Sequence, residues 1–182
     1  MTQTTKTKED SALATGFECI SMMIASLLAV LLIFSFLFRV VGVDGESMCD
    51  TLNHNDRLIL ISEFYQVQRG DIVVIRRSGE EPYIKRVIAV AGDTLDIDDA
   101  TGRVLLNGTV LDEPYVRGGW TPSMGFIGPY TVKDGEIFAM GDNRTFSKDS
   151  RQVGVFLTED IIGEAVMRIF PLDSIGLIRN EE

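Results

Sequence analysis

The sequence has few of the residues that bind transition metals. Its 182 residues include one histidine and two cysteines, whereas a protein zinc site takes most of its four ligands from these two residue types. The histidine, His54, lies in the polar stretch 52–56, whose composition is typical of a surface turn. The sequence therefore argues against a zinc centre, and we interpret His54 as a surface residue.

The two cysteines do not predict a disulfide. Cys19 lies inside an apolar run and Cys49 follows it, so we expect the two side chains on opposite sides of a membrane boundary. Cys49 stands two positions after Ser47 and returns to the same face if the segment is extended. A reactive thiol is one interpretation of Cys49, and a small buried side chain is the one we prefer.

Basic residues are outnumbered as well. The chain has 17 lysines and arginines against 27 aspartates and glutamates, a formal net charge of −10. Residues 1–41 contain three charges of each sign, so the whole excess lies in residues 42–182. Nucleic-acid binding needs clustered Lys and Arg, so an acidic body argues against a nucleic-acid partner. The apolar fraction of 45% excludes a disordered chain.

Charged residues are missing altogether from residues 20–38. As a helix, these 19 residues would span about 28 Å, close to the roughly 30 Å hydrocarbon core of a bilayer. We predict a transmembrane anchor at 17–41 after a short tail at 1–16. The alternatives are a buried helix of a soluble protein and a cleaved signal peptide, but no small-x-small site follows the run.

The charges on either side of the run orient the predicted anchor. Lys6, Lys8 and the terminal amine precede it, and Arg39 follows it. Because cytoplasmic flanks carry the excess of positive charge, the tail is expected in the cytoplasm. The sequence thus predicts a single-pass protein of the cell membrane with residues 42–182 on the extracytoplasmic side.

After Gly42 the chain changes to short apolar stretches bounded by Gly, Asp and Asn, the pattern of a mainly β domain. The pair Asn107-Gly108 predicts a two-residue hairpin. Only residues 157–162 suggest a short helix, with Thr158 as its N-cap. The predicted strands are 57–62, 71–76, 83–91, 94–97, 104–106, 109–111, 130–132, 137–140 and 165–169.

Ser47 and Lys85 permit a nucleophile and its base. A serine hydroxyl needs a base to take its proton, and with one histidine a Ser-His pair would depend on His54. A lysine serves as the base only when neutral, and lowering its pKa from about 10.4 to about 7 costs roughly 4.6 kcal/mol. On the pattern alone, a charged lysine at the edge of a sheet stays open as the alternative.

Strand alternation bears on this question. In a strand over 83–90, Lys85 shares a face with Tyr83, Val87 and Ala89. An apolar face disfavours the ammonium and lowers the pKa of the lysine, as a base requires.

Four segments, in this order, resemble the sequence boxes of type I signal peptidases, the membrane-anchored Ser-Lys endopeptidases that remove signal peptides from exported proteins. They are 47–52, 70–74, 85–93 and 140–151. Each segment alone is weak, but four in order behind one N-terminal anchor are highly specific. The compact segment 93–140 and the single anchor are similar to Gram-positive members of the family.

The resemblance implies a fold, a reaction and its substrates. The fold is a set of folded-over antiparallel β-sheets behind the transmembrane helix. The implied reaction is cleavage of exported preproteins at the membrane surface, after small-x-small sites such as Ala-x-Ala, without cofactor or metal. The implied partners are preproteins emerging from the translocation machinery, together with membrane lipid.

The resemblance also assigns roles to single residues. Ser47 is the implied nucleophile, Lys85 the base, and Ser147 the hydroxyl that orients the lysine. The backbone N–H of Ser47 is implied for the oxyanion hole, whereas Gly45 stands where some members add a hydroxyl donor. The implied supporting charges are Asp142, Arg144, Asp149 and Arg151.

Asp50 departs from the family pattern, which has proline at this position. A proline fixes φ, so its loss loosens the turn that aims Ser47. A carboxylate near Lys85 would also favour the ammonium and oppose its use as a base. One alternative is therefore a catalytically impaired relative that binds signal peptides or a membrane partner. Another is a self-cleaving Ser-Lys regulator with a similar β core, against which the predicted anchor and the absence of a DNA-binding region argue. In the simplest interpretation the Asp50 carboxylate stands in solvent.

Overall fold

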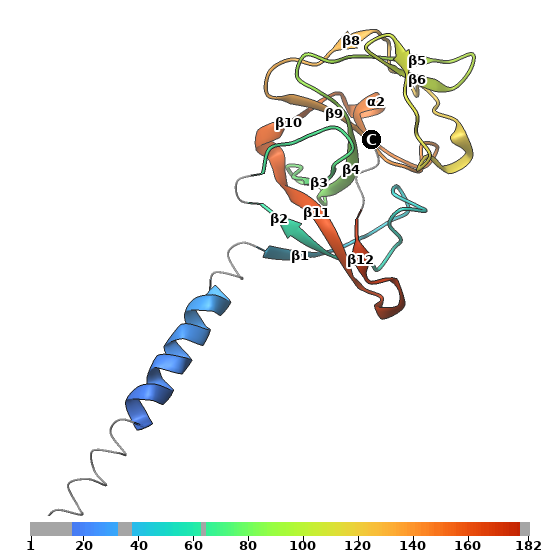
Figure 1. Ribbon diagram of the computed structural model, residues 1–182. Helices are drawn as coiled ribbons and strands as arrows, with labels where there is room; N and C mark the ends of the chain where they lie inside the picture. Colours follow the sequence, from blue (N-terminus) through green and yellow to red (C-terminus); the bar gives the residue numbers. More distant parts are fainter. Residues whose placement is uncertain (1–15, 33–37, 63–64, 179–182) are drawn as a thin grey trace, which may run out of the picture. The chain divides into compact units, whose positions relative to one another are not determined.

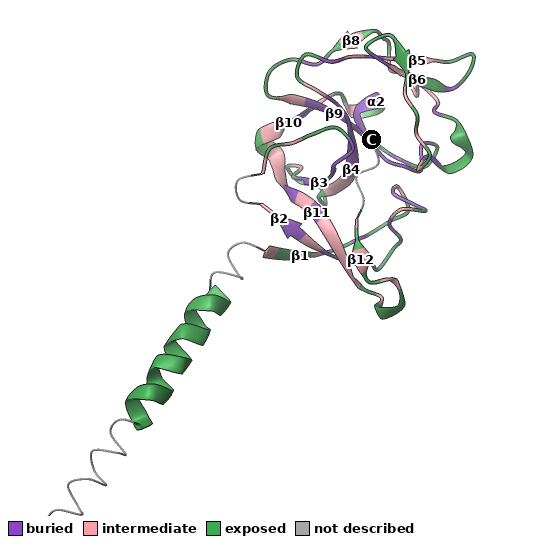
Figure 2. Cartoon of the chain, viewed as in Figure 1, coloured by how far each residue is buried: buried purple, intermediate pink, exposed green. Residues whose placement is uncertain are grey.

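The computed structural model describes residues 16–32, 38–62 and 65–178, and the chain forms two units, Met1–Phe38 and Arg39–Glu182. The described part of the first unit is a helix over residues 16–32 with exposed side chains (Figures 1 and 2). Within the described ranges, no helix is long and apolar enough to cross a bilayer. The predicted tail, apart from Gly16, and residues 33–37 of the predicted anchor lie outside these ranges.

The first strand corrects the predicted end of the anchor. We expected the anchor to continue to residue 41, but Phe38–Gly42 forms strand β1. Its neighbour is strand β2, Arg57–Ile61, so the chain is extended and paired where a helix was expected. The β-branched pair Val40 and Val41 suits an extended backbone.

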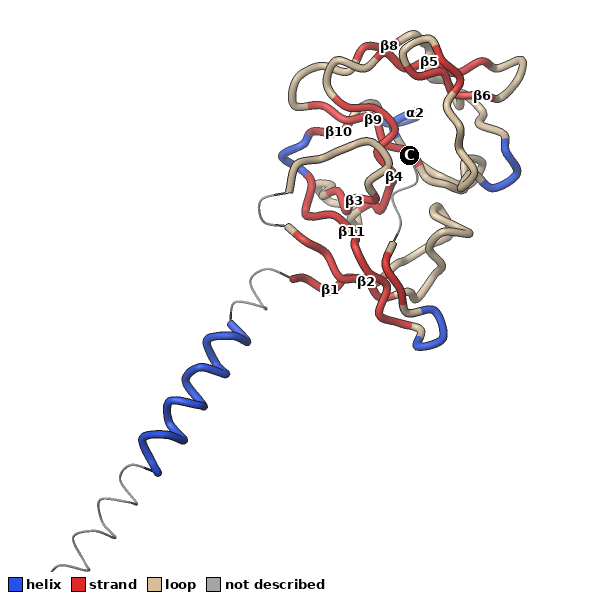
Figure 3. Tube along the Cα trace, viewed as in Figure 1, coloured by secondary structure: helices blue, strands red, loops and turns tan. Residues whose placement is uncertain are grey.

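Most strands form one antiparallel eight-stranded sheet (Figure 3). Its order is β1-β2-β11-β3-β4-β9-β10, and β12 pairs with β11. The further strands are β3 (Ile72–Ile75), β4 (Tyr83–Val90), β9 (Glu136–Met140), β10 (Phe156–Leu157), β11 (Ile161–Phe170) and β12 (Gly176–Leu177). The predicted mainly β fold is confirmed, and β4 and β9 lie among the buried strands (Figure 2).

A second antiparallel sheet has the order β7-β6-β5-β8. Its strands are β5 (Thr94–Asp98), β6 (Arg103–Leu106), β7 (Thr109–Val110) and β8 (Tyr130–Thr131). The predicted hairpin is confirmed, because Leu106 pairs with Thr109 across Asn107 and Gly108, whose φ angles are 52° and 80°. Positive φ at both turn positions is what this residue pair supplies at low cost.

The predicted helix over 157–162 is wrong. Only Thr158–Asp160 is helical, as the 3-10 turn η2, and Thr158 is not its N-cap. The flanking residues belong to β10 and β11, so strand pairing prevails over local helix signals. A short helix that the sequence did not predict, α2, spans Ser150–Val153, and the Asp149 side chain caps it by accepting from the Arg151 N–H. The two other 3-10 turns are η1 (Arg117–Gly119) and η3 (Leu172–Ser174).

The core has three apolar clusters that use different faces of the strands. One includes Met48 and Leu52 together with Ile72 of β3. A second includes Val73 and Val87, and a third fills the space between β4, β9 and the small sheet. Because Met48 and Leu52 are both 1% exposed, the turn that carries Ser47 is anchored in the core on both sides of its exposed residues.

Candidate functional site

The segment Gly45 to Leu52 is a turn that presents Ser47 beside strand β4. Gly45 has a φ of +93°, a conformation that glycine adopts without penalty. The Leu52 N–H donates to Met48 O at 2.8 Å and closes the turn. The turn is also tied to the segment after β9, because the Asn143 N–H donates to Ser47 O and its side-chain amide donates to Glu46 O, both at 3.0 Å.

Lys85 reaches Ser47 directly. The Nζ atom of Lys85 donates to Ser47 Oγ at 2.7 Å and to Ile84 O at 3.0 Å. The lysine is 4% exposed, and this burial lowers its pKa to about 8, although the Asp149 and Asp142 carboxylates act in the opposite direction. A lysine in this state loses its proton around pH 8 rather than above pH 10, and the acceptor of its hydrogen bond is a potential nucleophile.

The predicted face of Lys85 is correct in part. Tyr83 and Val87 belong with it to one side of β4, since the Tyr83 ring lies near Lys85 Nζ and both residues contribute to one cluster. Ala89 instead packs in the cluster under the small sheet. The reason is an irregularity between Val87 and Ala89 in the pairing of β4 with β9, which reverses the alternation beyond it.

A cleft of about 480 Å³ opens beside Ser47 and Lys85. Ser47 and Lys85 line it, and its apolar wall includes Val41, Val74 and Ile162. Within the described part of the chain, the Ser47 N–H has no hydrogen-bond partner, whereas the Gly45 N–H donates to His54 Nδ1 at 3.3 Å. The Ser47 N–H is therefore available to an oxygen in the cleft.

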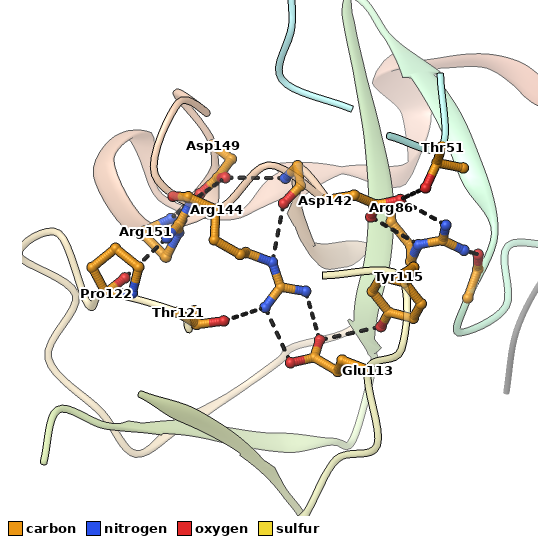
Figure 4. A network of polar contacts seen from close by, with 12 residues as sticks. Thr51, Arg86, Glu113, Tyr115, Thr121, Pro122, Asp142, Arg144, Asp149 and Arg151 are labelled. Atoms are coloured by element: carbon orange, nitrogen blue, oxygen red, sulfur yellow. Dashed lines mark hydrogen bonds and ion pairs between the residues drawn. The ribbon is translucent and has the colours of Figure 1, made fainter. Parts of the chain in front are cut away.

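Buried ion pairs fix the segment after β9, the last of the four sequence boxes (Figure 4). Asp142 accepts from Arg86 of β4 at 2.9 and 2.7 Å and from Thr51 Oγ1 at 2.6 Å. It thus joins strand β4, the turn that carries Ser47 and the last box in one contact set. Arg86 also lies over the Tyr115 ring, with its Cζ atom 4.0 Å from the ring centroid.

The two arginines of the segment itself, Arg144 and Arg151, have different partners. Arg151 pairs with Asp149 at 2.8 and 2.7 Å, inside the same box. Arg144 pairs with Glu113 and also donates to Thr121 Oγ1 at 2.6 Å (Figure 4). Glu113 and Thr121 were not among the predicted site residues, because nothing in their local sequence indicates that the chain between the two sheets supplies partners to a buried arginine.

Known proteins match nearly the whole chain. A family model described as signal peptidase, peptidase S26, matches residues 16–170. The chain belongs to this signal peptidase family. A signal peptidase I of Bacillus amyloliquefaciens is 37% identical over 93% of this chain and 95% of its own. A probable signal peptidase I-2 of Synechocystis sp. is 31% identical over 98% of this chain and 84% of its own.

A solved structure of a signal peptidase I from Enterococcus faecalis V583 covers 55% of this chain and 97% of its own, with 27% identity and a TM-score of 0.47. Membership of the family makes the chain a serine peptidase of the type I signal peptidase class. The resemblance inferred from the four segments is thereby confirmed.

In this member of the signal peptidase family, Asp50 is turned to solvent. Its side chain is 79% exposed, and Arg117 Nε lies 4.0 Å from its carboxylate. Asp50 is not among the charged groups that shift the pKa of Lys85. The peptide bond between Cys49 and Asp50 is cis. The interpretation of Asp50 as a solvent-facing residue is confirmed, and its carboxylate does not raise the pKa of Lys85.

Cys49 and His54 lie apart from the dyad. Cys49 is buried, its Sγ lies 3.5 Å from Asn53 Oδ1, and burial raises the pKa of the thiol, so the reactive thiolate is disfavoured. His54 is exposed, with Nδ1 3.2 Å from Asp44 Oδ1. Both residues match their preferred interpretations, a buried filler and a surface residue.

Ser147 is close to the site but does not bond to the lysine. Its side chain is 2% exposed, and no hydrogen bond joins its Oγ to Lys85 Nζ among the described residues. The prediction of a direct hydrogen bond is therefore wrong: Lys85 donates to Ser47 Oγ and Ile84 O, and the buried Ser147 hydroxyl has no hydrogen-bond partner among the described residues. A Cβ added at Gly141 would collide with Ser147 Oγ and Ser47 O, so this glycine permits the close approach.

Proposed function

We propose that this signal peptidase works through a Ser-Lys dyad in which Ser47 is the nucleophile and Lys85 the general base. The carrying observation is the 2.7 Å hydrogen bond between Lys85 Nζ and Ser47 Oγ, made where burial lowers the pKa of the lysine to about 8. Partial neutrality near physiological pH provides the base that a serine hydroxyl needs.

The reaction follows from these positions. Neutral Lys85 takes the hydroxyl proton as Ser47 Oγ attacks the scissile carbonyl, and the tetrahedral oxyanion accepts a hydrogen bond from the Ser47 N–H. The lysine ammonium then gives its proton to the leaving amine, and an acyl-enzyme ester remains on Ser47. Neutral Lys85 next activates a water molecule, which releases the signal peptide and restores the serine.

The buried charges act as supports in this proposal. Asp142, with Arg86 and Thr51, ties the serine turn to β4, and Arg144, Asp149 and Arg151 hold the following segment in place. Ser147 lies in this segment, with its Oγ close to Gly141. The charged side chains help to fix the distance between the two reacting groups, because their hydrogen bonds join the serine turn, β4 and the segment after β9.

The cleft supports an extended substrate with small side chains. Strand β4 pairs with β3 from Tyr83 onward but with β9 only from Arg86, so within the described residues Tyr83–Lys85 have no strand partner on that side. An extended peptide adds to such an edge by main-chain hydrogen bonds. Every second side chain then points into the apolar cleft, which fits cleavage after a small-x-small site such as Ala-x-Ala.

We place the reaction at the extracytoplasmic membrane surface. The uncharged run at residues 20–38 supports an anchor, now ending before β1, and the single Arg39 after it supports residues 42–182 outside the cytoplasm. Preproteins arriving from the translocation machinery and bilayer lipid are the proposed partners. Protease added to intact spheroplasts should digest the domain; a chain protected until the membrane is permeabilised would contradict this topology.

The mechanism is tested by substitution in the purified full chain with an Ala-x-Ala preprotein. Ser47→Ala and Lys85→Ala should each abolish processing, since each removes a group that forms or breaks a bond. Cys49→Ala is the matched control, because it changes a neighbouring nucleophilic side chain and should keep activity. Processing that survives Ser47→Ala or Lys85→Ala would refute the dyad.

The same assay on the unmodified chain decides between the remaining alternatives. Turnover of the preprotein supports the peptidase, whereas saturable peptide binding without turnover would favour the impaired, signal-peptide-binding relative. The self-cleaving regulator predicts fragments of the chain itself after incubation at alkaline pH, and an intact chain dismisses it.

A further inference from the structure

A cluster of charged side chains holds the hydroxyl end of Tyr83, two positions before Lys85. The Tyr83 hydroxyl donates to Glu80 Oε2 at 2.6 Å. Arg77 Nη2 lies 3.5 Å and Lys148 Nζ 3.4 Å from the Glu80 carboxylate. Glu80 therefore joins the connection between β3 and β4 to the segment that follows β9, and Tyr83 is fixed between them.

The ring of Tyr83 lies against the catalytic lysine. Lys85 Nζ is 5.2 Å from the ring centroid, and Arg77 Cζ is 5.3 Å from it. Phe156 meets the ring edge-on at a centroid distance of 6.2 Å. Tyr83 itself is half-buried and lines the cleft, whereas Lys85 is 4% exposed. The ring thus covers part of the lysine on the side of the open cleft.

Several charged groups surround Lys85, and those that act on its pKa directly do so in opposite directions. The surrounding groups are Asp142, Asp149 and Arg151 from the segment after β9, and Glu80, Arg77 and Lys148 beyond the Tyr83 ring. Burial dominates the shift, and Glu80 is not among the charges that act directly on Lys85. Water admitted beside the amine would stabilise the ammonium and raise the pKa.

We propose that Glu80 is a positioning residue of the Ser-Lys site, which keeps the Tyr83 ring over Lys85 and excludes water from the amine on the cleft side. Glu80 is exposed and does not touch the dyad, so it acts only through Tyr83. The proposal rests on the proposed role of Lys85 as the base. It gives the surface cluster around Glu80 a part in setting the pH range of the reaction.

The test is the pH dependence of kcat/KM for the full chain in detergent with an Ala-x-Ala preprotein. Glu80→Ala and Tyr83→Phe each break the same hydrogen bond, and each should move the midpoint to higher pH by about 0.5 unit or more. Because both remove the hydrogen bond between Tyr83 and Glu80, the double variant should shift the midpoint by less than the sum of the two single shifts. Activity should recover at pH values well above the new midpoint.

Two further variants sharpen the result. Glu80→Gln keeps an acceptor for the Tyr83 hydroxyl and should restore most of the original midpoint. Glu159→Ala removes an exposed carboxylate on η2 and should leave the midpoint unchanged. A midpoint that stays or moves to lower pH in both Glu80→Ala and Tyr83→Phe overturns the proposal, as does a loss of activity at every pH in both.

The failure of this inference is distinguishable from failure of the dyad. If Lys85→Ala retains activity, the role of Lys85 itself is refuted and the midpoint does not report on it. If Lys85→Ala is inactive and the midpoint is insensitive to Glu80 and Tyr83, only the positioning role is refuted.

Discussion

Lys85 combines two requirements that oppose each other. As the proposed base it has to be neutral, and burial makes a neutral fraction accessible by lowering its pKa to about 8. The same burial makes the charged form costly in the folded state, so the residue that supports activity weakens the fold at neutral pH. Ser47 Oγ and Ile84 O offset part of this cost by accepting hydrogen bonds from Nζ.

Lys85→Met should therefore be inactive but more stable than the unmodified chain at pH 7. The folded pKa of Lys85 lies below its unfolded value, so the folded state binds fewer protons between about pH 8 and 10.5 and gains stability as the pH rises through that window. Below pH 8 the burial cost is fully present, about 3 kcal/mol at 1.36 kcal/mol per unit.

Urea unfolding of both chains in detergent measures this difference. The advantage of Lys85→Met should be largest at pH 7 and should shrink by pH 9.5. If the stability advantage of Lys85→Met grew with pH, or if Lys85→Met were less stable than the unmodified chain at pH 7, burial of the charged lysine would not be destabilising.

At the scale of elements, the position of strand β4 relative to Ser47 depends on a contact among three different parts of the chain. Asp142 follows β9, Arg86 lies in β4 and Thr51 lies in the serine turn, and the three side chains meet away from solvent. The serine turn has no long helix or strand of its own to support it. Its position is set by Met48 and Leu52 in the core and by these bonds.

Asp142→Asn should destabilise the protein by about 3–5 kcal/mol, because it leaves Arg86 as a buried charge without its counter-ion. Asp50→Asn is the matched control, an identical change in the serine turn at an exposed carboxylate, and should cost at most about 0.5 kcal/mol. Thermal or urea unfolding of the two variants compares them. Similar losses in both would mean that Asp50 supports the turn more than its exposure indicates.

The sequence predicts well those elements that are determined by the pattern of neighbouring residues in the chain. Period-two patterns and the Asn107-Gly108 turn identify strands and a hairpin without knowledge of the rest of the chain. Residues 157–162 have equally good local helix signals, yet pairing with neighbouring strands prevails. The displacement of Ala89 by the irregularity in β4 and the pairing of Arg144 with Glu113 both depend on partners far away in the chain.

At the scale of the whole molecule, the contact between Ser47 and Lys85 was predictable from the order of the four segments along the chain. Ser47 and Lys85 are 38 positions apart, and only the ordered segments indicated that they meet. The predicted hydrogen bond from Ser147 to Lys85 is absent from the described part of the chain. A family pattern indicates which residues lie together in the site, but not which donor pairs with which acceptor.

For the whole molecule, we expect kcat/KM to rise with pH and the free energy of unfolding to fall in acid. Burial raises the pKa of the Asp93 and Asp149 carboxyls, but their hydrogen bonds to Arg69 and Arg151 prevail and hold both pKa values below the ordinary range. Stability from these groups is present above about pH 4, the ordinary value, and is lost as the pH falls through the lowered pKa values.

With Lys85 as the proposed base, kcat/KM should increase through a midpoint near pH 8 with a slope of one proton. The measurement is kcat/KM from pH 5 to 10, with circular dichroism at each pH to show that the domain stays folded. Because the carboxylates titrate far below this midpoint, a folded protein with a midpoint below pH 6 would assign the base to a group other than Lys85.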